Sequence, residues 1–286
     1  MNRRDQIVAT IETITALPPV AVQMIPLLQN PDASLKDITQ RLSHDPGLTA
    51  NTLRLANCSM HAARQPIVQV GDAIKRLGTR RVLGLIIGSS VASIARTRVK
   101  GYDLAEGELW RHAVAVAIGT EELAAVLGVC APPHAFTAGL LADIGKVVLG
   151  TFLAVDAQRI TTRAFDNGIP FDQAEREVLG IDHAEVGAML MAHWKLPADI
   201  VDVVRWHHLP DQCASDRSVV GLVHVADHIC ALSGIGEGVD GLNYQPSRQV
   251  LEDLKVSTDT IERTLCGLME RLEHAEALLA APAGSA

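Results

Sequence analysis

The sequence predicts an all-α protein, and three observations support that fold class. Apolar residues recur at helical spacings along most of the 286 residues, whereas Val, Ile and Thr rarely alternate with polar residues at the period of two that marks a strand. Aromatic residues make up 3% of the chain, which is low for a sheet protein. Helix-capping residues recur between the apolar segments. We therefore expect a multi-helix N-terminal subdomain packed on a second helical subdomain.

Start and stop signals place the helices of the first hundred residues. Ser34 caps one helix, with Asp37 in its first turn, and the next helix has Asp45 as its cap and Pro46 at its first position. Four residues of this second helix should face a core, namely Leu48, Thr52, Leu55 and Ala56. Two more helices complete this half and are expected over residues 71–77 and 79–95, the second of them central.

A segment rich in glycine and acidic residues, 100–107, marks the boundary between the two halves. Apolar spacing and caps then predict five further helices. They are expected over residues 108–127, over 138–153, after the Asp182 cap with Glu185 in its first turn, from Pro197 to 209–210, and over 217–232.

The C-terminal part should contain a linker, one helix and a tail. The glycine-rich residues 233–241 are expected to form the linker. Apolar residues at 261, 265, 268 and 272 suit a helix that packs along another helix, in the same chain or across a homodimer. Residues 281–286 are expected to be disordered. The predicted division of the chain is therefore 1–100, 101–235 and 236–286.

The composition predicts a reduced, cytoplasmic protein without a membrane span. Hydrophobic residues make up 48% and charged residues 20% of the chain, which is typical of a globular protein. The longest apolar run, residues 82–92, is shorter than the roughly 18 residues that a membrane helix needs, and residues 1–15 lack the apolar core of a signal peptide. The five cysteines form no CxxC pair, so neither a disulfide framework nor a structural zinc site is indicated.

The net charge of −8 is unevenly distributed. Residues 1–101 carry 13 basic and 6 acidic residues, and the remainder carries the acidic excess. The simplest interpretation is that the two halves attract each other or that the charges lie on solvated helix faces. Nucleic-acid binding through the basic residues 64–100 ranks third among the functional hypotheses, because the neighbouring leucines appear in core positions and aromatic side chains for base stacking are absent there.

Asp143 is the most informative acidic residue, since it lies inside the otherwise apolar segment FTAGLLADIGK, Phe136 to Lys146. Burying a carboxylate costs several kcal/mol unless a cation, a metal ion or a set of hydrogen bonds compensates it. Two interpretations remain open at this point. Asp143 pairs with Lys146 or caps a helix, or it is a metal ligand.

Six ionisable residues lie on five predicted helices, several of them in core-facing positions: His112, Asp143, His183, His207, His208 and Asp227. His207 and His208 continue the apolar stripe of their helix, and Asp227 lies in a helix that is almost apolar all round. Imidazoles and carboxylates together are the ligands of Mn, Fe or Zn sites. For any single histidine, a buried core residue with its hydrogen bonds satisfied is the simpler explanation. The whole set predicts a metal site if its members converge.

The chain to about residue 235 resembles the HDOD family, the HD-related output domains of bacterial signalling. The motifs that carry the resemblance are DPGLT followed by LRLANCS, AIKRLGTRRV, FTAGLLADIGK, GIDHAEVGAMLMAHWKLPADIVDVVRWHH and VHVAD. The resemblance implies that the first hundred residues form the N-terminal helical HDOD subdomain. It also implies that residues 101–235 form a degenerate HD-like helical subdomain, related to metal-dependent phosphohydrolases.

The resemblance also assigns roles to individual residues, and at one position the expected ligand is missing. His112 corresponds to the first histidine of the HD superfamily, Asp143 to the aspartate of the HD pair, and Asp227 to the closing aspartate. His183 and His207 or His208 correspond to further histidines of two-metal members. Ala142 stands where the histidine of the HD pair is expected, so one of two metal sites loses a ligand while the other could keep a residual divalent ion.

The implied function is therefore non-catalytic. HD-GYP cyclic-di-GMP phosphodiesterases carry a Gly-Tyr-Pro loop, and the chain has no such tripeptide, since Gly101-Tyr102 is followed by Asp103. We expect a bacterial signal-transduction protein, linked to processes such as cyclic-di-GMP signalling, that binds a protein partner or a small ligand such as a nucleotide. The alternative is a residual metal-dependent phosphohydrolase or phosphodiesterase acting on a nucleotide or cyclic dinucleotide.

Overall fold

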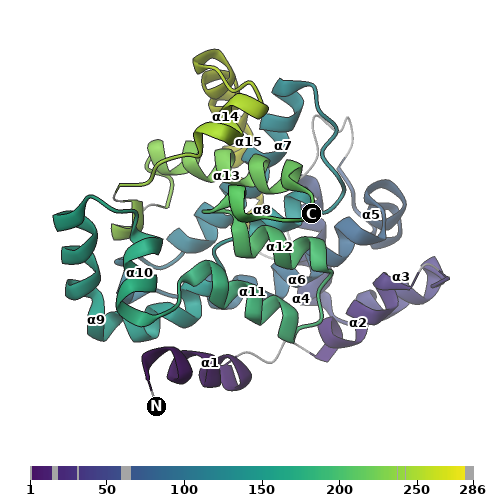
Figure 1. Cartoon of the computed structure of the whole chain (residues 1–286). Helices are drawn as coiled ribbons and strands as arrows, with labels where there is room; N and C mark the ends of the chain where they lie inside the picture. Colours follow the sequence, from purple (N-terminus) through teal and green to yellow (C-terminus); the bar gives the residue numbers. More distant parts are fainter. Residues whose placement is uncertain are drawn as a thin grey trace.

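The computed structural model describes residues 2–14, 19–30, 32–58, 66–236, 238–241 and 243–280. Within these ranges the chain forms helices and turns and no strand, so the all-α prediction is confirmed (Figure 1). The first group of helices is α1 Arg3–Ile14, α2 Pro19–Gln29, α3 Leu35–Ser43, α4 Pro46–Cys58, α5 Val70–Leu77, α6 Thr79–Ala95 and the short η1 Lys100–Tyr102. The second group is α7 Glu108–Leu127, α8 Ala135–Leu141, α9 Gly145–Asn167, α10 Phe171–Leu179, α11 His183–His193, α12 Ala198–Trp206, η2 Pro210–Gln212, α13 Arg217–Leu232, η3 Val239–Gly241, α14 Arg248–Asp253 and α15 Thr258–Ala280.

Helices α2 to α6 pack against one another and form the first half of the molecule. The predicted caps are confirmed: Ser34 Oγ accepts the backbone N–H groups of Lys36 and Asp37 at the start of α3. Asp45 accepts the N–H of Leu48 at 2.8 Å and starts α4. The predicted core positions Leu48, Thr52 and Ala56 are buried, and the side chain of Leu55 lies outside the described part of the chain.

Helix α7 is the centre of the second half and packs against α8, α13 and α15. It is rich in alanine and valine, and most of its residues are buried. Gly139 of α8 lies so close to α7 that an added Cβ would be 3.0 Å from the Cα of Ala117. Because glycine has no side chain, the two helices approach closely there.

The predicted helix over 138–153 is wrong, because a turn at residues 142–144 separates α8 from α9. No proline marks this break, and the apolar pattern continues through it, so periodicity did not reveal it. Gly145 begins α9 directly against α11: an added Cβ would lie 1.9 Å from the carbonyl oxygen of His183. The turn places Asp143 between two helices, beside the start of α11.

The stretch Ala135–Asn167 has the length and mean hydropathy of a membrane span, with a mean hydropathy of 1.7 in its most apolar window. However, 72% of that window is buried inside the molecule. Burial against other helices is what a core helix pair of a folded domain shows, and α8 and α9 pack on α7 and α11 in this way.

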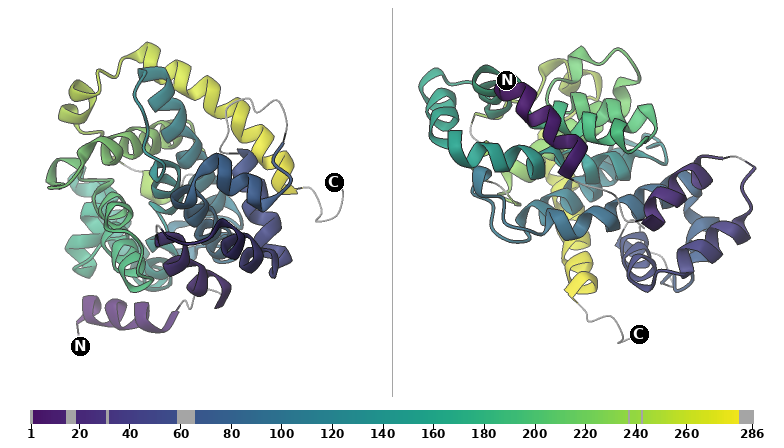
Figure 2. Two further views of the ribbon diagram at one scale, coloured as in Figure 1. Left: turned by 90° about the vertical axis from the view of Figure 1, so that its right-hand side faces the viewer. Right: turned by 90° about the horizontal axis from the view of Figure 1, so that it is seen from below.

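Ion pairs join the basic first half to the acidic second half. Among the described residues, four such pairs join positions far apart in the sequence: Arg3–Asp156, Arg4–Glu185, Arg80–Asp199 and Arg81–Glu121. Helix α1 itself packs on α9 and α11, away from α2 to α5 (Figure 2). These pairs support the interpretation that the charge asymmetry reflects attraction between the two halves, and they use basic residues that a nucleic-acid surface would need.

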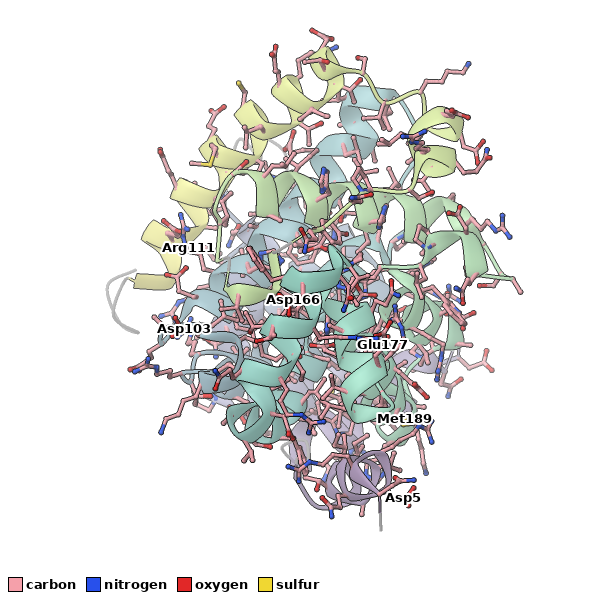
Figure 3. All side chains as sticks on the ribbon, turned by 60° about the vertical axis from the view of Figure 1, so that its left-hand side comes forward. Asp5, Asp103, Arg111, Asp166, Glu177 and Met189 are labelled. Carbon is pink, nitrogen blue, oxygen red and sulfur yellow. The ribbon has the colours of Figure 1, made fainter. Side chains whose placement is uncertain are left out.

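Helix α15 packs on α7 and α4 of the same chain, so the in-chain alternative for this helix is confirmed (Figure 2). Leu268 and Leu272 are buried in this contact. Arg271 of α15 donates to Glu121 and Glu122 of α7 at 2.7 and 2.6 Å. Arg111, labelled beside α15 in Figure 3, donates to Glu276 at 2.7 Å.

The prediction of a linker at residues 233–241 is wrong for its described part, which is packed against the second half. Ile235 is buried, and an added Cβ at Gly236 would lie 2.7 Å from the Cβ of His112. Gly238 is equally tight, since its added Cβ would lie 2.1 Å from the carbonyl oxygen of Tyr102. The glycines in this segment therefore permit close packing. The predicted disordered tail, 281–286, lies outside the described residues.

Candidate functional site

The six site residues expected from the sequence meet in one buried region. His112 comes from α7, Asp143 from the turn between α8 and α9, His183 from the start of α11 and Asp227 from α13, while His207 and His208 directly follow α12. Their ligand atoms form two groups, each within 4.8 Å. The four-residue group is Asp143, His183, His207 and His208, and the three-residue group is His112, Asp143 and Asp227. Asp143 is shared by both.

Three of these histidines use Nδ1 to bond away from the centre of the site. Their partners are Ile235 O for His112 (2.7 Å), Glu175 Oε2 for His183 (2.8 Å) and Val204 O for His207 (2.8 Å). Because carbonyl and carboxylate oxygens only accept, each of these Nδ1 atoms carries a proton, and Nε2 is the ring nitrogen that faces the centre of the site. The three Nε2 atoms lie 3.2, 3.4 and 3.6 Å from carboxylate oxygens of Asp143. This second layer of contacts is typical of histidines that bind metal ions.

The two oxygens of Asp143 face different surroundings. Oδ1 lies towards Nε2 of His183 and His207, and no hydrogen bond among the described residues satisfies it. Nε2 of His207 is likewise buried without a hydrogen-bond partner in the described chain. Oδ2 lies 3.2 Å from Nε2 of His112 and 3.0 Å from Nζ of Lys146. A buried lone pair facing an unsatisfied carboxylate oxygen is unfavourable unless a cation lies between them.

Lys146 supplies a cation on the Oδ2 side. Its Nζ lies 3.0 Å from Asp143 and 2.5 Å from Asp240, and the side chain is buried. Burial alone would lower the pKa of Lys146, but the charges of Asp143 and Asp240 outweigh that effect and raise it. Burial would also raise the pKa of Asp143, but Lys146 holds that pKa well below its usual range. The sequence interpretation that pairs Asp143 with Lys146 is therefore confirmed.

The pKa values of the site histidines shift in opposite directions: those of His112 and His183 are raised, and that of His208 is lowered. Burial opposes a charged ring at His112, yet its hydrogen bonds to Asp143 and Asp227 raise the pKa of His112 to about 10. Burial and the neighbouring imidazoles of His207 and His183 hold the pKa of His208 well below its ordinary value. His208 is therefore neutral at pH 7, and its Nε2 lies 2.9 Å from Nε2 of His183. A neutral ring is the form that binds a metal ion.

Sequence reasoning missed the residues that support these ligands. Glu175 is completely buried and accepts from the backbone N–H of His183 as well as from its ring. Tyr102 donates to the other oxygen of Glu175 at 2.6 Å, so the Gly-Tyr segment at the predicted boundary lies beside the site. Asp240 and Tyr244 were also missed. Among these supporting residues, only Glu175 lies near a predicted ligand in the sequence, eight residues before His183. The other contacts join distant parts of the chain, so no local pattern indicates them.

The donor set fits one divalent ion at the four-residue group. This group offers three imidazoles and one carboxylate oxygen as ligands. Two of its ligand atoms, Asp143 Oδ1 and His207 Nε2, lack hydrogen-bond partners within the described ranges. Such nitrogen and oxygen ligands suit Mn, Fe or Zn. The three-residue group fits a second ion less well, since Lys146 already places a positive charge at Asp143 Oδ2.

The site is covered on the Lys146 side. A cavity of about 20 Å³ remains, lined by His112, Lys146, His208, Asp227, Asp240 and Tyr244 among others. A volume of this size holds roughly one water-sized occupant. Tyr244 lies against His208 with ring centroids 5.2 Å apart and closes this side. A nucleotide therefore enters only if the cover moves.

The fold and the site agree with the comparison of this chain with known families, because the HDOD domain family matches residues 14–210. The chain belongs to the HDOD family. A protein from Treponema pallidum (strain Nichols), described as uncharacterized, is 26% identical to it over 227 residues. That match covers 76% of this chain and 42% of the relative, so this HDOD chain spans less than half the length of that curated protein.

Solved structures share the fold of this HDOD protein. An HDOD domain protein of unknown function from Geobacter sulfurreducens is 24% identical, with a TM-score of 0.69 over 97% of this chain and 99% of the other. A presumed phosphohydrolase from Shewanella amazonensis SB2B is 27% identical, with a TM-score of 0.62 over 92% and 97%. A presumed signal transduction protein from Marinobacter aquaeolei VT8 is 21% identical, with a TM-score of 0.67 over 96% and 64%.

Two further features of the site of this HDOD protein bear on its function. Residue 142 is a buried alanine at the end of α8, directly before Asp143, so it offers no ligand atom. The residues that cover the Lys146 side, among them Asp240 and Tyr244, lie beyond the part of the chain that the family matches. The four-residue group therefore lies within the part of the chain that the family matches, and Asp240 and Tyr244 lie outside it.

Proposed function

We propose that this HDOD protein is a non-catalytic signal-transduction protein whose site binds one divalent ion and responds to a protein partner or a small ligand. The observation that carries the proposal is the position of Lys146 Nζ, 3.0 Å from Oδ2 of Asp143. The ammonium group lies beside the three-residue group, in which His112, Asp143 and Asp227 would hold a second ion if one were bound. A fixed side-chain charge here neutralises the carboxylates without offering an open coordination position.

Hydrolysis of a phosphate ester by a two-metal site needs a metal-bound water and stabilisation of the leaving oxygen. Ala142 removes a ligand, Lys146 takes the place of an exchangeable ion, and the cover leaves a cavity of about 20 Å³. Each of these features opposes turnover. The fold and the four-residue group are retained, which supports a role in binding.

The proposal also includes a cellular location and a pathway. The free cysteines among the described residues, Cys130, Cys213, Cys230 and Cys266, are in keeping with a reducing cytoplasm. The presumed signal transduction protein of Marinobacter aquaeolei supports a signalling role by fold similarity. A bacterial pathway such as cyclic-di-GMP signalling is the context that we propose.

A direct test measures turnover and metal content in the same preparation. The purified protein, made with Mn and Fe available and without a chelating tag, is incubated with a panel of nucleotides and cyclic dinucleotides. We expect about one metal ion per chain by elemental analysis and no product above the buffer blank. Turnover that is lost in Asp143→Asn would overturn the proposal.

The second candidate function is a residual phosphohydrolase, and one observation favours it. The four ligands Asp143, His183, His207 and His208 lie within 4.8 Å of one another, which is the arrangement that an active single-metal centre would need. The 27% identical presumed phosphohydrolase adds support. The turnover assay separates the two candidates, because only the residual enzyme releases product.

A further inference from the structure

The loop that joins the two halves of the molecule carries one side chain from the surface to the candidate site. We call residues 96–107, between α6 and α7, the junction loop. Two backbone hydrogen bonds of 3.1 and 3.3 Å between Val99 and Leu104 close this loop. Tyr102 lies inside the closed part and is completely buried, whereas its neighbour Asp103 is exposed at the edge of the molecule (Figure 3). The junction loop therefore connects the solvent to the interior beside the site.

Close packing fixes the position of Tyr102. An added Cβ at Gly101 would lie 2.5 Å from the carbonyl oxygen of Gly150, so the junction loop touches the backbone of α9. An added Cβ at Gly238 would lie 2.1 Å from the carbonyl oxygen of Tyr102. The Tyr102 ring also packs against Phe171, with ring centroids 5.9 Å apart. Because backbone and ring are both held tightly, the phenol hydroxyl has a defined position.

The hydroxyl of Tyr102 completes the hydrogen bonding of Glu175. Glu175 is completely buried, and its Oε2 accepts from the backbone N–H of His183 at 2.9 Å and from the ring Nδ1 at 2.8 Å. Its Oε1 accepts from Tyr102 at 2.6 Å, and that oxygen has no other donor among the described residues. Without the hydroxyl, a buried carboxylate oxygen would be unpaired, which costs free energy unless the carboxylate turns or gains a proton. Either change alters the contact that orients the His183 ring.

We propose that Tyr102 is a positioning residue of the metal site, acting through Glu175 on the ring of His183, whose Nε2 lies 3.4 Å from Asp143 Oδ1. The inference rests on the proposed function, because it assumes an ion at the four-residue group. Coupling between binding free energies is reciprocal. If the Tyr102 hydrogen bond raises the affinity for the ion, the bound ion stabilises the buried position of Tyr102 to the same extent. Metal occupancy is therefore coupled to the junction loop, whose exposed residues a partner protein can contact.

The test titrates Co²⁺ into the purified, metal-free protein and follows its visible absorption, because the bands report both occupancy and ligand geometry. Tyr102→Phe removes only the hydroxyl. The affinity for Co²⁺ should fall about tenfold, the lower end of the range for losing a contact that supports a ligand. Thr120→Val is the matched control, since Thr120 has a completely buried hydroxyl that donates within α7 to Val116 O at 2.7 Å. This variant should bind Co²⁺ as the wild type does.

Two further measurements separate positioning from packing. In a Glu175→Gln background, Tyr102→Phe should weaken Co²⁺ binding by less than about twofold, because Tyr102 acts through the Glu175 carboxylate. Saturating Co²⁺ should slow hydrogen exchange in residues 99–104 of the wild type, a readout that needs no variant, and this protection should be smaller in Tyr102→Phe. A side chain that only packs would weaken binding equally in both backgrounds and leave the metal-dependent protection unchanged.

The inference would be overturned by equal Co²⁺ affinity of Tyr102→Phe and the wild type, or by exchange in residues 99–104 that does not respond to the metal. A wild type that binds no Co²⁺ would overturn it together with the metal site. Failure of the non-catalytic role is a different result. Hydrolysis of a nucleotide by the wild type would refute that role, while the comparison of Tyr102→Phe with the wild type would still decide whether Tyr102 positions His183.

Discussion

The ammonium group of Lys146 lies 3.0 Å from Oδ2 of Asp143, so a side chain supplies positive charge beside the three-residue group of His112, Asp143 and Asp227. The same ammonium contacts Asp240, 94 residues further along the chain. Lys146 and Asp143 are buried, the Asp240 side chain is 14% exposed, and both carboxylates share the same cation for their charge balance. The properties of the site should therefore change most when Lys146 is replaced.

Lys146→Met should lower the free energy of unfolding by roughly 3–5 kcal/mol, because it leaves Asp143 and Asp240 as buried charges without their cation. Urea denaturation measures the loss. Added Mn²⁺ should restore much of it, since the three-residue group can then take an ion. Lys75→Met, which affects only an exposed pair with Asp72, should show neither effect. The charge-balancing role of the Lys146 ammonium would be contradicted if Lys146→Met were as stable as the wild type and Mn²⁺ did not change its stability.

His207→Ala should abolish metal binding at the four-residue group. His207 is completely buried and its Nε2 faces Asp143 Oδ1, so its removal deletes one of four ligands. Elemental analysis after dialysis should find metal in the wild type and almost none in the variant. His193→Ala is the control, because His193 is exposed at the end of α11. Equal metal content in all three proteins would place the metal elsewhere.

Glu175→Gln should weaken metal binding about 10- to 100-fold without unfolding the protein. Glu175 accepts from the ring of His183 and from Tyr102, so the change removes the charge that orients the ligand. Competition with a fluorescent chelator measures the affinity. Glu177→Gln on the same helix, whose carboxylate pairs with Arg163 at the surface, should leave the affinity unchanged. If both variants bind alike, Glu175 has only a packing role.

Arg271→Met should destabilise the protein by about 3 kcal/mol, because it leaves Glu121 and Glu122 in a largely buried position without one of their cations. Arg263→Met, on an exposed face of the same helix, should change stability by less than about 1 kcal/mol. Thermal and urea denaturation measure the stability change of each variant. A mild effect of Arg271→Met would show that α15 is held to α7 mainly by its apolar residues.

The sequence by itself predicted most of the helices and the residues that meet in the candidate site. Capping residues such as Ser34 and Asp45 act within a few residues of themselves, so local pattern was sufficient to place helix starts. The inward positions of His183, His207 and His208 followed from helical periodicity, and that of Asp227 from the apolar character of its whole helix. Their convergence was predicted only as a consequence of the family resemblance.

Only the tertiary structure decided how the site is completed. The turn at 142–144 depends on close contact between Gly145 and His183, which no local pattern encodes. Asp240 and Tyr102 reach the site from distant segments that the sequence suggested were a linker and a domain boundary. Helix periodicity shows which face of a helix is buried, but not which distant residue meets it. Pairing across the chain depends on helix packing, which is settled when the whole core forms.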